Sequence, residues 1–482
     1  MTAMDLKRIA TGIPELDAVL RGGVLRHRVH LIEGRPGTGK TTFGLRYLTE
    51  GAAAGDTCLY LTLSETEEEL RATAASHGWP LDGITIEEVM PLPPAAMPPQ
   101  TILLPTDSEL SALVNRIADR VAAVDAQRVV IDSMVEVRLL ARDSASYRRQ
   151  IIELRRRLSE LKATVILLDD LTSDGHEFEL QSAVHAVITL EQREHSFGAA
   201  RRRLRVVKLR GGDFQSGWHD YAIKTGEILV FPSLIAQEHH RDSQPYEIVS
   251  GVDSLDRLFG GALAGGSSTM VIGPSGVGKS TLALQFASAA LQAGHQVGYF
   301  TFDESEDALR SRLVQHVREQ ETARRPRRFH LHRINPSRIS PGEFIWKVRR
   351  LVEDQQACLI IIDSINSYLD VIREEKSLLL QMNELFSYLS NMNVTAIIVG
   401  AHSATLDTSK EPDALSIITD NIISLRYHEQ DAAVHKAITI LKKRHGPHSQ
   451  DIRALRLTDA GIEIGERIRM PGEQAGGEPL ES

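Results

Sequence analysis

The feature that most constrains this chain is a short glycine-rich motif that occurs twice. Gly34-Arg-Pro-Gly-Thr-Gly-Lys-Thr-Thr42 and Gly273-Pro-Ser-Gly-Val-Gly-Lys-Ser-Thr281 both fit the pattern GxxxxGK[ST], and their lysines lie 239 positions apart. The segment Gly12-Ile-Pro-Glu-Leu-Asp17 recurs at the same spacing as Gly251-Val-Asp-Ser-Leu-Asp256. Landmarks that keep their order and spacing predict a duplicated domain.

Within each copy, short apolar runs alternate with longer helical patterns. Val29-His-Leu-Ile32 and Val129-Val-Ile131 are such runs in the first copy, and Leu359-Ile-Ile-Ile362 is one in the second. Continuous apolar strands separated by helices are typical of a parallel sheet that is covered on both faces. We therefore predict an α/β fold with two tandem P-loop NTPase domains, each a mostly parallel sheet with helices on both faces.

The predicted domain boundaries follow the repeat. We expect a first ATPase domain over residues 1–236, a polar linker over 237–247 and a second ATPase domain over 248–466. Residues 467–482 are rich in Gly, Pro and Glu, which predicts a disordered tail. The N-terminus lacks the apolar core of a signal peptide, and no window approaches about 18 apolar residues, so we expect a cytoplasmic protein without a membrane partner.

Each glycine-rich motif lies between an apolar strand and a helical pattern, which is the setting of a phosphate-binding loop. The glycines permit a tight turn whose backbone N–H groups point at a β-phosphate, and the helix N-terminus adds its positive dipole end. A glycine-rich turn that binds nothing is the alternative. We predict ATP and Mg²⁺ as cofactors, with the lysine neutralising β- and γ-phosphate oxygens. The predicted ATP-binding residues are Gly34, Gly37, Thr38, Gly39, Lys40, Thr41, Thr42, Gly273, Ser275, Gly276, Val277, Gly278, Lys279, Ser280 and Thr281.

An aspartate ends a bulky apolar strand in each copy. Asp132 and Asp363 lie 231 positions apart, and each is followed by serine. This position puts a carboxylate at the C-terminal edge of the sheet beside the phosphate loop, where a Mg²⁺-bound water needs an acceptor. The alternative role is a cap for the next helix. We predict Thr41 and Asp132 as metal residues of the first copy, and Ser280 and Asp363 as those of the second.

A glutamate follows the second predicted strand of each copy. Glu65 and Glu304 come 25 residues after the loop lysines. A carboxylate there can orient the water, or another hydroxyl, that attacks the γ-phosphate. The second copy has two adjacent acids, Asp303 and Glu304, whereas Ser64 precedes Glu65 in the first. We predict catalytic roles for Glu65, Asp303 and Glu304, against the alternative that they are solvent-exposed acids.

A Lys-x-Arg pair follows a late apolar strand in both copies. The pair Lys208 and Arg210 recurs 234 positions later as Lys442 and Arg444. A γ-phosphoryl group in transfer accumulates negative charge on its outer oxygens, and a cation from a neighbouring subunit is a common way to neutralise it. We predict that these four residues are catalytic, against the alternative that they are salt-bridged surface residues.

Together these motifs resemble the KaiC-like family of clock ATPases, which belongs to the RecA/DnaB superfamily. The resemblance covers about residues 8–465 and includes Arg203-Leu-Arg-Val-Val-Lys-Leu-Arg-Gly211 and Gly217-Trp-His219. It implies two RecA-like domains in a double-ring homohexamer, with ATP bound between subunits. The first ring would be a slow ATPase, and the second an autokinase and autophosphatase. It also implies a KaiB-like protein or a signalling histidine kinase as a partner in clock-type signalling or timing.

The resemblance also locates the phosphorylated residues, and it shows where this chain departs from the family. The family's Ser/Thr pair maps to Ser416 and Ile417. Ser416 implies serine phosphorylation, but Ile417 replaces the threonine that a two-site cycle needs. The family's tandem glutamates become Ser64-Glu65 and Asp303-Glu304. Because a serine cannot activate the attacking group, Glu65 would act alone, which implies weak hydrolysis in the first ring.

Two other functions remain open from the residues alone. One is a DNA-directed motor of the RecA, RadA or DnaB type, and the other is an ATP-gated scaffold without kinase activity. The chain has 64 acidic residues against 55 Lys plus Arg, a net charge of −9, and it lacks a zinc-binding Cys cluster. This balance weighs against nucleic acid as a partner. We therefore favour a hexameric ATPase with serine autophosphorylation.

Overall fold

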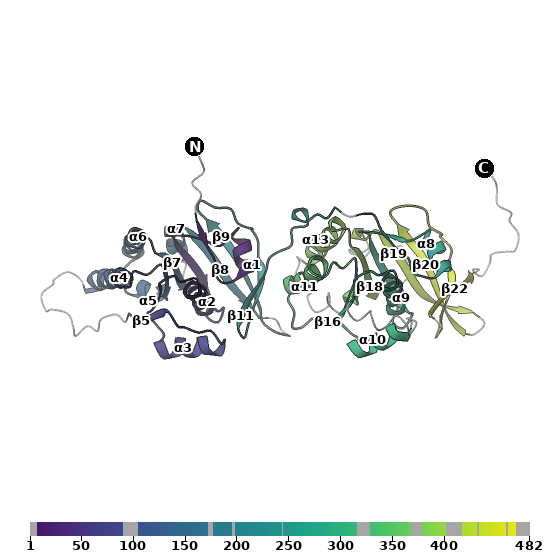
Figure 1. The fold of residues 1–482 in the computed structure, drawn as a ribbon, viewed down its shortest axis with the longest axis horizontal. Helices are drawn as coiled ribbons and strands as arrows, with labels where there is room; N and C mark the ends of the chain where they lie inside the picture. Colours follow the sequence, from purple (N-terminus) through teal and green to yellow (C-terminus); the bar gives the residue numbers. More distant parts are fainter. Residues whose placement is uncertain are drawn as a thin grey trace, which may run out of the picture. The chain divides into compact units, whose positions relative to one another are not determined.

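The computed structural model describes residues 7–89, 105–171, 177–194, 198–242, 244–315, 328–366, 368, 378–401, 417–430, 433–458 and 461–468. The chain divides into two compact units, Met1–Ser233 and Leu234–Ser482. Each unit contains one nine-stranded sheet. Figure 1 shows the ribbon of both units coloured along the sequence.

The sheet of the first domain is mostly parallel. Its strand order is β11-β10-β9-β8-β3-β7-β6-β4-β5. The strands from β8 to β5 are paired in parallel, and β9, β10 and β11 extend the sheet in antiparallel pairs. The bounds are β3 (Val29–Gly34), β4 (Cys58–Thr62), β5 (Ile84–Glu88), β6 (Arg128–Asp132), β7 (Thr164–Asp170), β8 (Ala186–Arg193), β9 (Arg201–Leu209), β10 (His219–Lys224) and β11 (Glu227–Phe231).

Helices cover both faces of the first sheet because its central strands are apolar on both sides. Ile32 and Tyr60 belong to the core on one face, together with residues of α1, α2 and α3, whereas Leu31 and Leu59 belong to the core on the other, under α4, α5, α6 and α7 (Figure 1). The helix bounds are α1 (Pro14–Val19), α2 (Lys40–Ala53), α3 (Glu67–Ser76), α4 (Pro105–Val124), α5 (Met134–Leu139), α6 (Ser144–Glu160) and α7 (Glu177–Ala183). The short strands β1 (Arg8–Ile9) and β2 (Val24–Leu25), which precede and follow α1 in the sequence, form a separate antiparallel pair.

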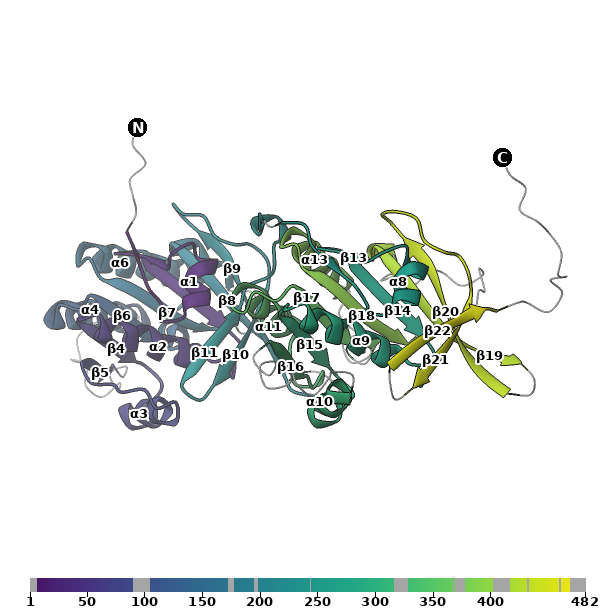
Figure 2. The same ribbon diagram turned by 45° about the vertical axis from the view of Figure 1, so that its right-hand side comes forward.

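The second domain repeats this architecture. Its strand order, β16-β15-β17-β18-β14-β19-β20-β21-β22, matches the first sheet strand for strand. The four last strands, yellow-green to yellow in Figure 2, extend the sheet outward from β14. The bounds are β14 (Ser268–Gly273), β15 (Val297–Thr301), β16 (Phe329–Arg333), β17 (Leu359–Asp363), β18 (Thr395–Ala401), β19 (Asn421–Gln430), β20 (Ala433–Lys443), β21 (Arg453–Thr458) and β22 (Gly461–Arg467).

The helices of the second domain also lie on both faces of their sheet. One core joins the strands to α8, α9 and α10, and the other joins them to α11 and α13. The bounds are α8 (Asp253–Phe259), α9 (Lys279–Gln292), α10 (Glu306–Gln315), α11 (Pro341–Glu353) and α13 (Leu378–Asn391), with the short pair β12 (Glu247–Ile248) and β13 (Leu263–Ala264). The predicted α/β fold of two tandem RecA-like domains is confirmed.

Residues after the first domain pack on the second domain. Leu234 and Ala236 are buried in the core under α13, and Ala236 begins the 3₁₀ helix η2 (Ala236–Glu238). The Arg241 guanidinium donates to the Val352 carbonyl oxygen at 2.7 Å. Apolar anchors at the start of this stretch therefore attach part of the expected 237–247 linker to the second domain. At the other end, β22 continues to Arg467, and residues 469–482 lie outside the described residues.

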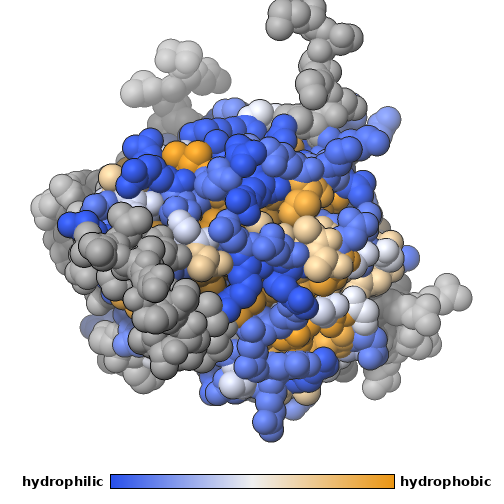
Figure 3. Space-filling model, turned by 90° about the vertical axis from the view of Figure 1, so that its left-hand side faces the viewer, coloured by the Kyte–Doolittle hydropathy of each residue, from blue (hydrophilic) through white to orange (hydrophobic). Residues whose placement is uncertain are grey.

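The face of the first domain seen in Figure 3 is mainly hydrophilic. Its apolar side chains form patches that hydrophilic side chains interrupt. Leu139 on α5 and Ile152 on α6 are among the exposed apolar residues of this domain. Among the described residues, no helix combines the length and the apolar character needed to span a bilayer.

Candidate functional site

The two glycine-rich motifs form the turns that connect β3 to α2 and β14 to α9. Gly37 and Gly39 have φ values of +83° and +95°, and Gly276 and Gly278 have +75° and +117°. L-residues with a side chain rarely adopt this region. A Cβ at Gly37 would meet no atom within 4 Å, so this glycine is needed for its backbone conformation and leaves the space above the loop open. All fifteen predicted ATP-binding residues lie on these two turns and the first turns of their helices.

Each loop lysine folds back over its own loop. The Lys40 ammonium donates to the carbonyl oxygens of residues 34 and 35 at 2.9 and 3.2 Å, and it forms an ion pair with Asp170. The Lys279 ammonium donates to the carbonyl oxygens of residues 273 and 274 at 2.8 and 2.9 Å. Burial lowers the pKa of Lys279. Both ammonium groups therefore lie where a phosphate above the loop would be neutralised.

The loop hydroxyl, an aspartate and a tyrosine form the same group in both domains. The Thr41 hydroxyl donates to Asp132 Oδ2 at 2.9 Å, and the Tyr60 hydroxyl donates to the same atom at 2.7 Å. Burial raises the pKa of Asp132, although both of these hydrogen bonds oppose the shift. The peptide bond after this aspartate is cis, as it is after Asp363 in the second domain.

In the second domain, Ser280 hydrogen-bonds to Asp363, and the Tyr299 hydroxyl donates to Asp363 Oδ2 at 2.6 Å. Burial again raises the pKa of the aspartate. Mg²⁺ in nucleotide sites is commonly held by one or two protein oxygens, phosphate oxygens and water. Within the described part of the chain, no group of three or more His, Cys, Asp or Glu residues could hold a metal. The hydroxyl and carboxylate beside each loop fit Mg²⁺ that is held jointly with a nucleotide.

The predicted catalytic glutamates follow β4 and β15 in matching turns. The backbone N–H of Glu65 donates to the Thr62 hydroxyl oxygen at 3.0 Å, and that of Glu304 donates to the Thr301 hydroxyl oxygen at 3.1 Å. Burial, then the charges of Asp132 and Glu69, raise the pKa of Glu65. A raised pKa makes this carboxylate a better proton acceptor near neutral pH.

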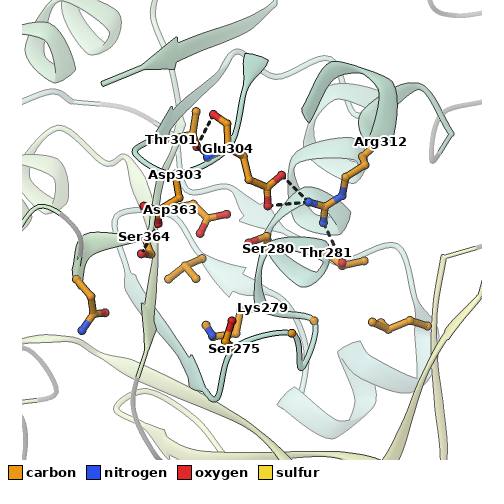
Figure 4. A pocket seen from close by; sticks show the side chains of 15 residues that line it. Ser275, Lys279, Ser280, Thr281, Thr301, Asp303, Glu304, Arg312, Asp363 and Ser364 are labelled. Carbon is orange, nitrogen blue, oxygen red and sulfur yellow. Dashed lines mark hydrogen bonds and ion pairs between the residues drawn. The ribbon is translucent and has the colours of Figure 1, made fainter. Parts of the chain in front are cut away.

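The second site is a cavity of about 550 Å³. Figure 4 shows its side chains converging from the loop, from the ends of β15 and β17, and from α10. The Ser364 hydroxyl donates to Asp303 Oδ2 at 3.0 Å, whereas the side chain of the next residue, Glu304, extends toward Arg312 (Figure 4). The lining residues are Ser275, Gly276, Gly278, Lys279, Ser280, Thr281, Thr301, Asp303, Glu304, Arg312, Asp363, Ser364, Asn366, Val399 and Leu457.

The structure does not bring the Lys-x-Arg pair of the first domain to the loop of that domain. Arg210 follows β9, and its backbone N–H donates to the His185 carbonyl oxygen at 2.9 Å, just before the start of β8. The phosphate loop follows the opposite end of β3, about 16 Å away along the strand. The Lys208 ammonium and the Arg210 guanidinium instead contact the last carbonyl oxygens of α7, at Gln181 and Ser182. Within one chain this pair therefore caps a helix.

The second Lys-x-Arg pair lies at the corresponding edge of the second sheet. The Lys442 ammonium donates to the Thr419 carbonyl oxygen at 2.5 Å, and Arg444 forms an ion pair with Asp420 at 3.1 Å. Burial and the neighbouring arginine lower the pKa of Lys442. The predicted phosphorylation site, Ser416, lies outside the described residues. Asp420, in the described segment that follows it, donates its backbone N–H to the carbonyl oxygen of Ser268 at the start of β14, which is the edge of the sheet opposite the chain's own phosphate loop.

Several residues that contact the site are missing from the sequence-based prediction. Tyr60 and Tyr299 bind the aspartates, and they lie 239 positions apart, so the repeat spacing alone could have identified them. Asp170 forms an ion pair with Lys40, and Arg312 forms one with Glu304. Neither residue has a counterpart in the other domain. No repeat spacing could have identified these two residues.

Comparisons with known proteins match nearly the whole chain. The family model described as "ATPase: KaiC" matches residues 9–235 and 248–469. The chain is 25% identical over 469 residues to "Circadian clock protein KaiC3" of a Synechocystis strain, covering 96% of this chain and 93% of that protein. It is 26% identical over 481 residues to "Circadian clock oscillator protein KaiC" of Thermostichus vulcanus, with 97% and 91% covered. The protein of that name from Synechococcus elongatus is 25% identical over 475 residues, with 96% and 90% covered.

Proposed function

This chain belongs to the KaiC family of ATPases, and from that premise we propose that it is a homohexameric ATPase that phosphorylates itself on Ser416. ATP with Mg²⁺ would bind at both phosphate loops. The first site would hydrolyse ATP slowly, and the second would also transfer phosphate to the serine. The cell would use this cycle in clock-type signalling or timing, with a KaiB-like protein or a signalling histidine kinase as partner.

The observation that carries the proposal is the repeated arrangement of lysine, hydroxyl, aspartate and glutamate at one edge of each sheet. Lys40 and Lys279 would hold phosphate oxygens, and bound Mg²⁺ would supply charge neutralisation. Glu65 or Glu304 would orient the attacking water and accept its proton, while the bond from the γ-phosphorus to the bridging oxygen breaks and ADP leaves with that electron pair. Asp303 would assist Glu304 in the second site.

The need for a second copy follows from the positions along the strands. Arg444 and Asp420 lie level with Ser268, at the edge of the sheet opposite their own loop and about 16 Å away along β14, and the Lys442 ammonium contacts the Thr419 carbonyl oxygen at that edge. The cations cannot serve that loop without a large rearrangement of the domain. A ring of copies would place one chain's opposite edge at the next chain's loop, which supports ATP sites between subunits.

The residues that follow Ser416 favour that serine as the acceptor. Ile417 has no hydroxyl, although it is 59% exposed, and Thr419 is fully buried. A kinase acceptor must present its hydroxyl to the γ-phosphate, so a buried threonine is a poor substrate.

Intact mass spectrometry after incubation with Mg·ATP tests the kinase function. We expect one added phosphate per chain, which is lost in Ser416→Ala and in Lys279→Ala but retained in Thr419→Ala. Size-exclusion chromatography of the same samples should show a hexamer when Mg·ATP is present. A hexamer that gains no phosphate would favour the ATP-gated scaffold, and ATPase activity strongly stimulated by single-stranded DNA would favour the DNA-directed motor.

A further inference from the structure

Arg312 is a cation inside the second site that contacts the predicted catalytic glutamate. It lies on α10 and lines the cavity. Its Nη1 donates to both carboxylate oxygens of Glu304, at 2.9 and 2.8 Å, and its Nη2 donates to the Thr281 hydroxyl oxygen at 3.0 Å. Figure 4 shows the guanidinium between these two partners, at the wall of the cavity beside the loop.

The first domain has a different residue at this position. Leu70 and Leu309 are both fully buried and lie 239 positions apart, so they align α3 with α10. Three residues after them come Thr73 and Arg312. The charges that act on Glu65 come from the acids Asp132 and Glu69. The two glutamates therefore occupy opposite electrostatic environments although their backbone turns match.

The contact limits what Glu304 can do. A carboxylate whose two oxygens both accept from one guanidinium is held in a fixed direction by that cation. In this arrangement Arg312 occupies one acceptor site on each oxygen of Glu304 and turns the carboxylate toward itself, so the direction in which Glu304 could orient a water molecule is set by the cation. The contact is partly exposed, with side-chain exposures of 31% for Arg312 and 35% for Glu304, so a competing anion can reach it.

A bound nucleotide would supply such an anion. Thr281 follows the loop hydroxyl residue Ser280 and lies in the first turn of α9, at the end of the helix that faces the phosphate position. The guanidinium that touches Thr281 is therefore adjacent to that position. Guanidinium groups bind phosphate oxygens through the same charged hydrogen bonds that they make with carboxylates. Phosphate and Glu304 would then compete for one cation.

We propose that Arg312 is a positioning residue that pairs with Glu304 at the wall of the second site and transfers its guanidinium to the polyphosphate when a nucleotide binds. The transfer frees the Glu304 carboxylate to orient the attacking group only when a nucleotide is present. The inference deepens the proposed function, because it rests on nucleotide binding at this loop and on the role of Glu304. It also makes the second site depend on a residue that the first site lacks.

Nucleotide affinity measured on the full chain tests the transfer. Lys40→Ala would serve as the common background, so that the second site alone reports, and ADP and a non-hydrolysable ATP analogue would be the probes in isothermal titration calorimetry. Arg312→Gln should weaken binding by about 10-fold, because a charged hydrogen bond to phosphate is lost. Arg312→Lys should recover part of that loss. Arg310→Gln, which removes an arginine paired with Glu306 at 3.9 Å on the same helix, should leave the affinity unchanged.

The decisive comparison is a double-mutant cycle with Glu304→Gln. When Arg312 is present, Glu304→Gln removes the competitor for the guanidinium and should tighten binding severalfold. In the Arg312→Gln background the same change should have a clearly smaller effect. Equal tightening in both backgrounds, or unchanged affinity in a folded Arg312→Gln variant with a normal melting temperature, would overturn the proposal.

These readouts separate this inference from the proposed function. Binding requires no turnover, so coupling between Arg312 and Glu304 can be found in a protein that gains no phosphate. In that case the autokinase proposal fails and the inference about Arg312 stands. If Ser416 is phosphorylated but Arg312 and Glu304 show no coupling in nucleotide binding, the autokinase proposal stands and the inference about Arg312 fails.

Discussion

The Lys40–Asp170 ion pair leads to a prediction that concerns the first site alone. The side chains of Lys40 and Asp170 are 9% and 31% exposed. Asp170 is opposite Gly34 in the parallel pair of β3 and β7, and the corresponding residue opposite Gly273 in the second domain is Ala401. A phosphate that binds Lys40 must displace this carboxylate. Removing its charge with Asp170→Asn should therefore tighten nucleotide binding at the first site.

The size of the effect follows from the burial of the pair. An exposed ion pair contributes up to about 1 kcal/mol and a hydrogen bond to a charged group about 1.5 to 3 kcal/mol. For a pair with one buried and one partly exposed member we expect about 1.4 kcal/mol, which corresponds to about tenfold in affinity. Lys40 keeps its two carbonyl acceptors in the variant, so the loop conformation should persist.

The assay is titration of ADP into the full chain in a Lys279→Ala background, where only the first site reports. Asp213→Asn is the matched control, because it removes one negative charge from an exposed pair with Arg21 in the same domain, at 4.0 Å. That control should change the affinity by less than about twofold, because such pairs contribute little. An affinity for Asp170→Asn that is unchanged, or weaker than that of the parent, would show that Asp170 does not compete with phosphate.

Three further predictions concern the stability of the two sites. Gly34→Ala should destabilise the first domain more than Gly37→Ala in urea unfolding. A Cβ at residue 34 would lie 2.6 Å from the backbone carbonyl oxygen of Leu190, which cannot move without the strand, whereas Gly37→Ala costs only about 1 kcal/mol for its positive φ; equal losses would contradict the geometry. Tyr299→Phe should lower the free energy of unfolding by about 1.5 to 3 kcal/mol, since a hydrogen bond to a buried carboxylate is lost, and a loss below about 0.5 kcal/mol would refute the contact. Burial raises the pKa of Asp169, on β7, to about 6, which is above its unfolded value. The contribution of the protonated Asp169 to the free energy of unfolding is therefore present below about pH 4 and is lost as the pH rises through 6. The free energy of unfolding should fall between pH 4 and pH 7, and Asp169→Asn should reduce that fall by up to about 3 kcal/mol. A pH dependence that is unchanged in the variant would argue against a buried carboxylate.

The fold and the phosphate loops could be predicted because their signals are local or repeated. A glycine at a positive φ, a lysine one residue later and a strand that ends in aspartate are each defined by neighbours in the chain. The constant spacing of 239 positions then shows that the arrangement occurs twice. The confirmed α/β fold depends on these features together with the apolar strands that alternate with helices.

Contacts that depend on side chains from distant elements could not be predicted in this way. Asp170 reaches Lys40 from β7, and Arg312 reaches Glu304 from two turns farther along α10. Each contact occurs in one domain only, so comparison of the two copies cannot reveal it. The Lys-x-Arg pairs show the reverse case: their recurrence is visible in the sequence, but only the structure shows that Lys208 and Arg210 cap α7 within their own domain.

The number of nucleotides bound per chain tests the central claim, that each domain binds ATP through its own phosphate loop. Equilibrium binding of ADP with Mg²⁺, read as stoichiometry, should give two nucleotides per chain for the unaltered protein. Lys40→Ala and Lys279→Ala should each leave one, and the double variant should leave none. One nucleotide per unaltered chain, or a second binding event that survives in the double variant, would contradict the account.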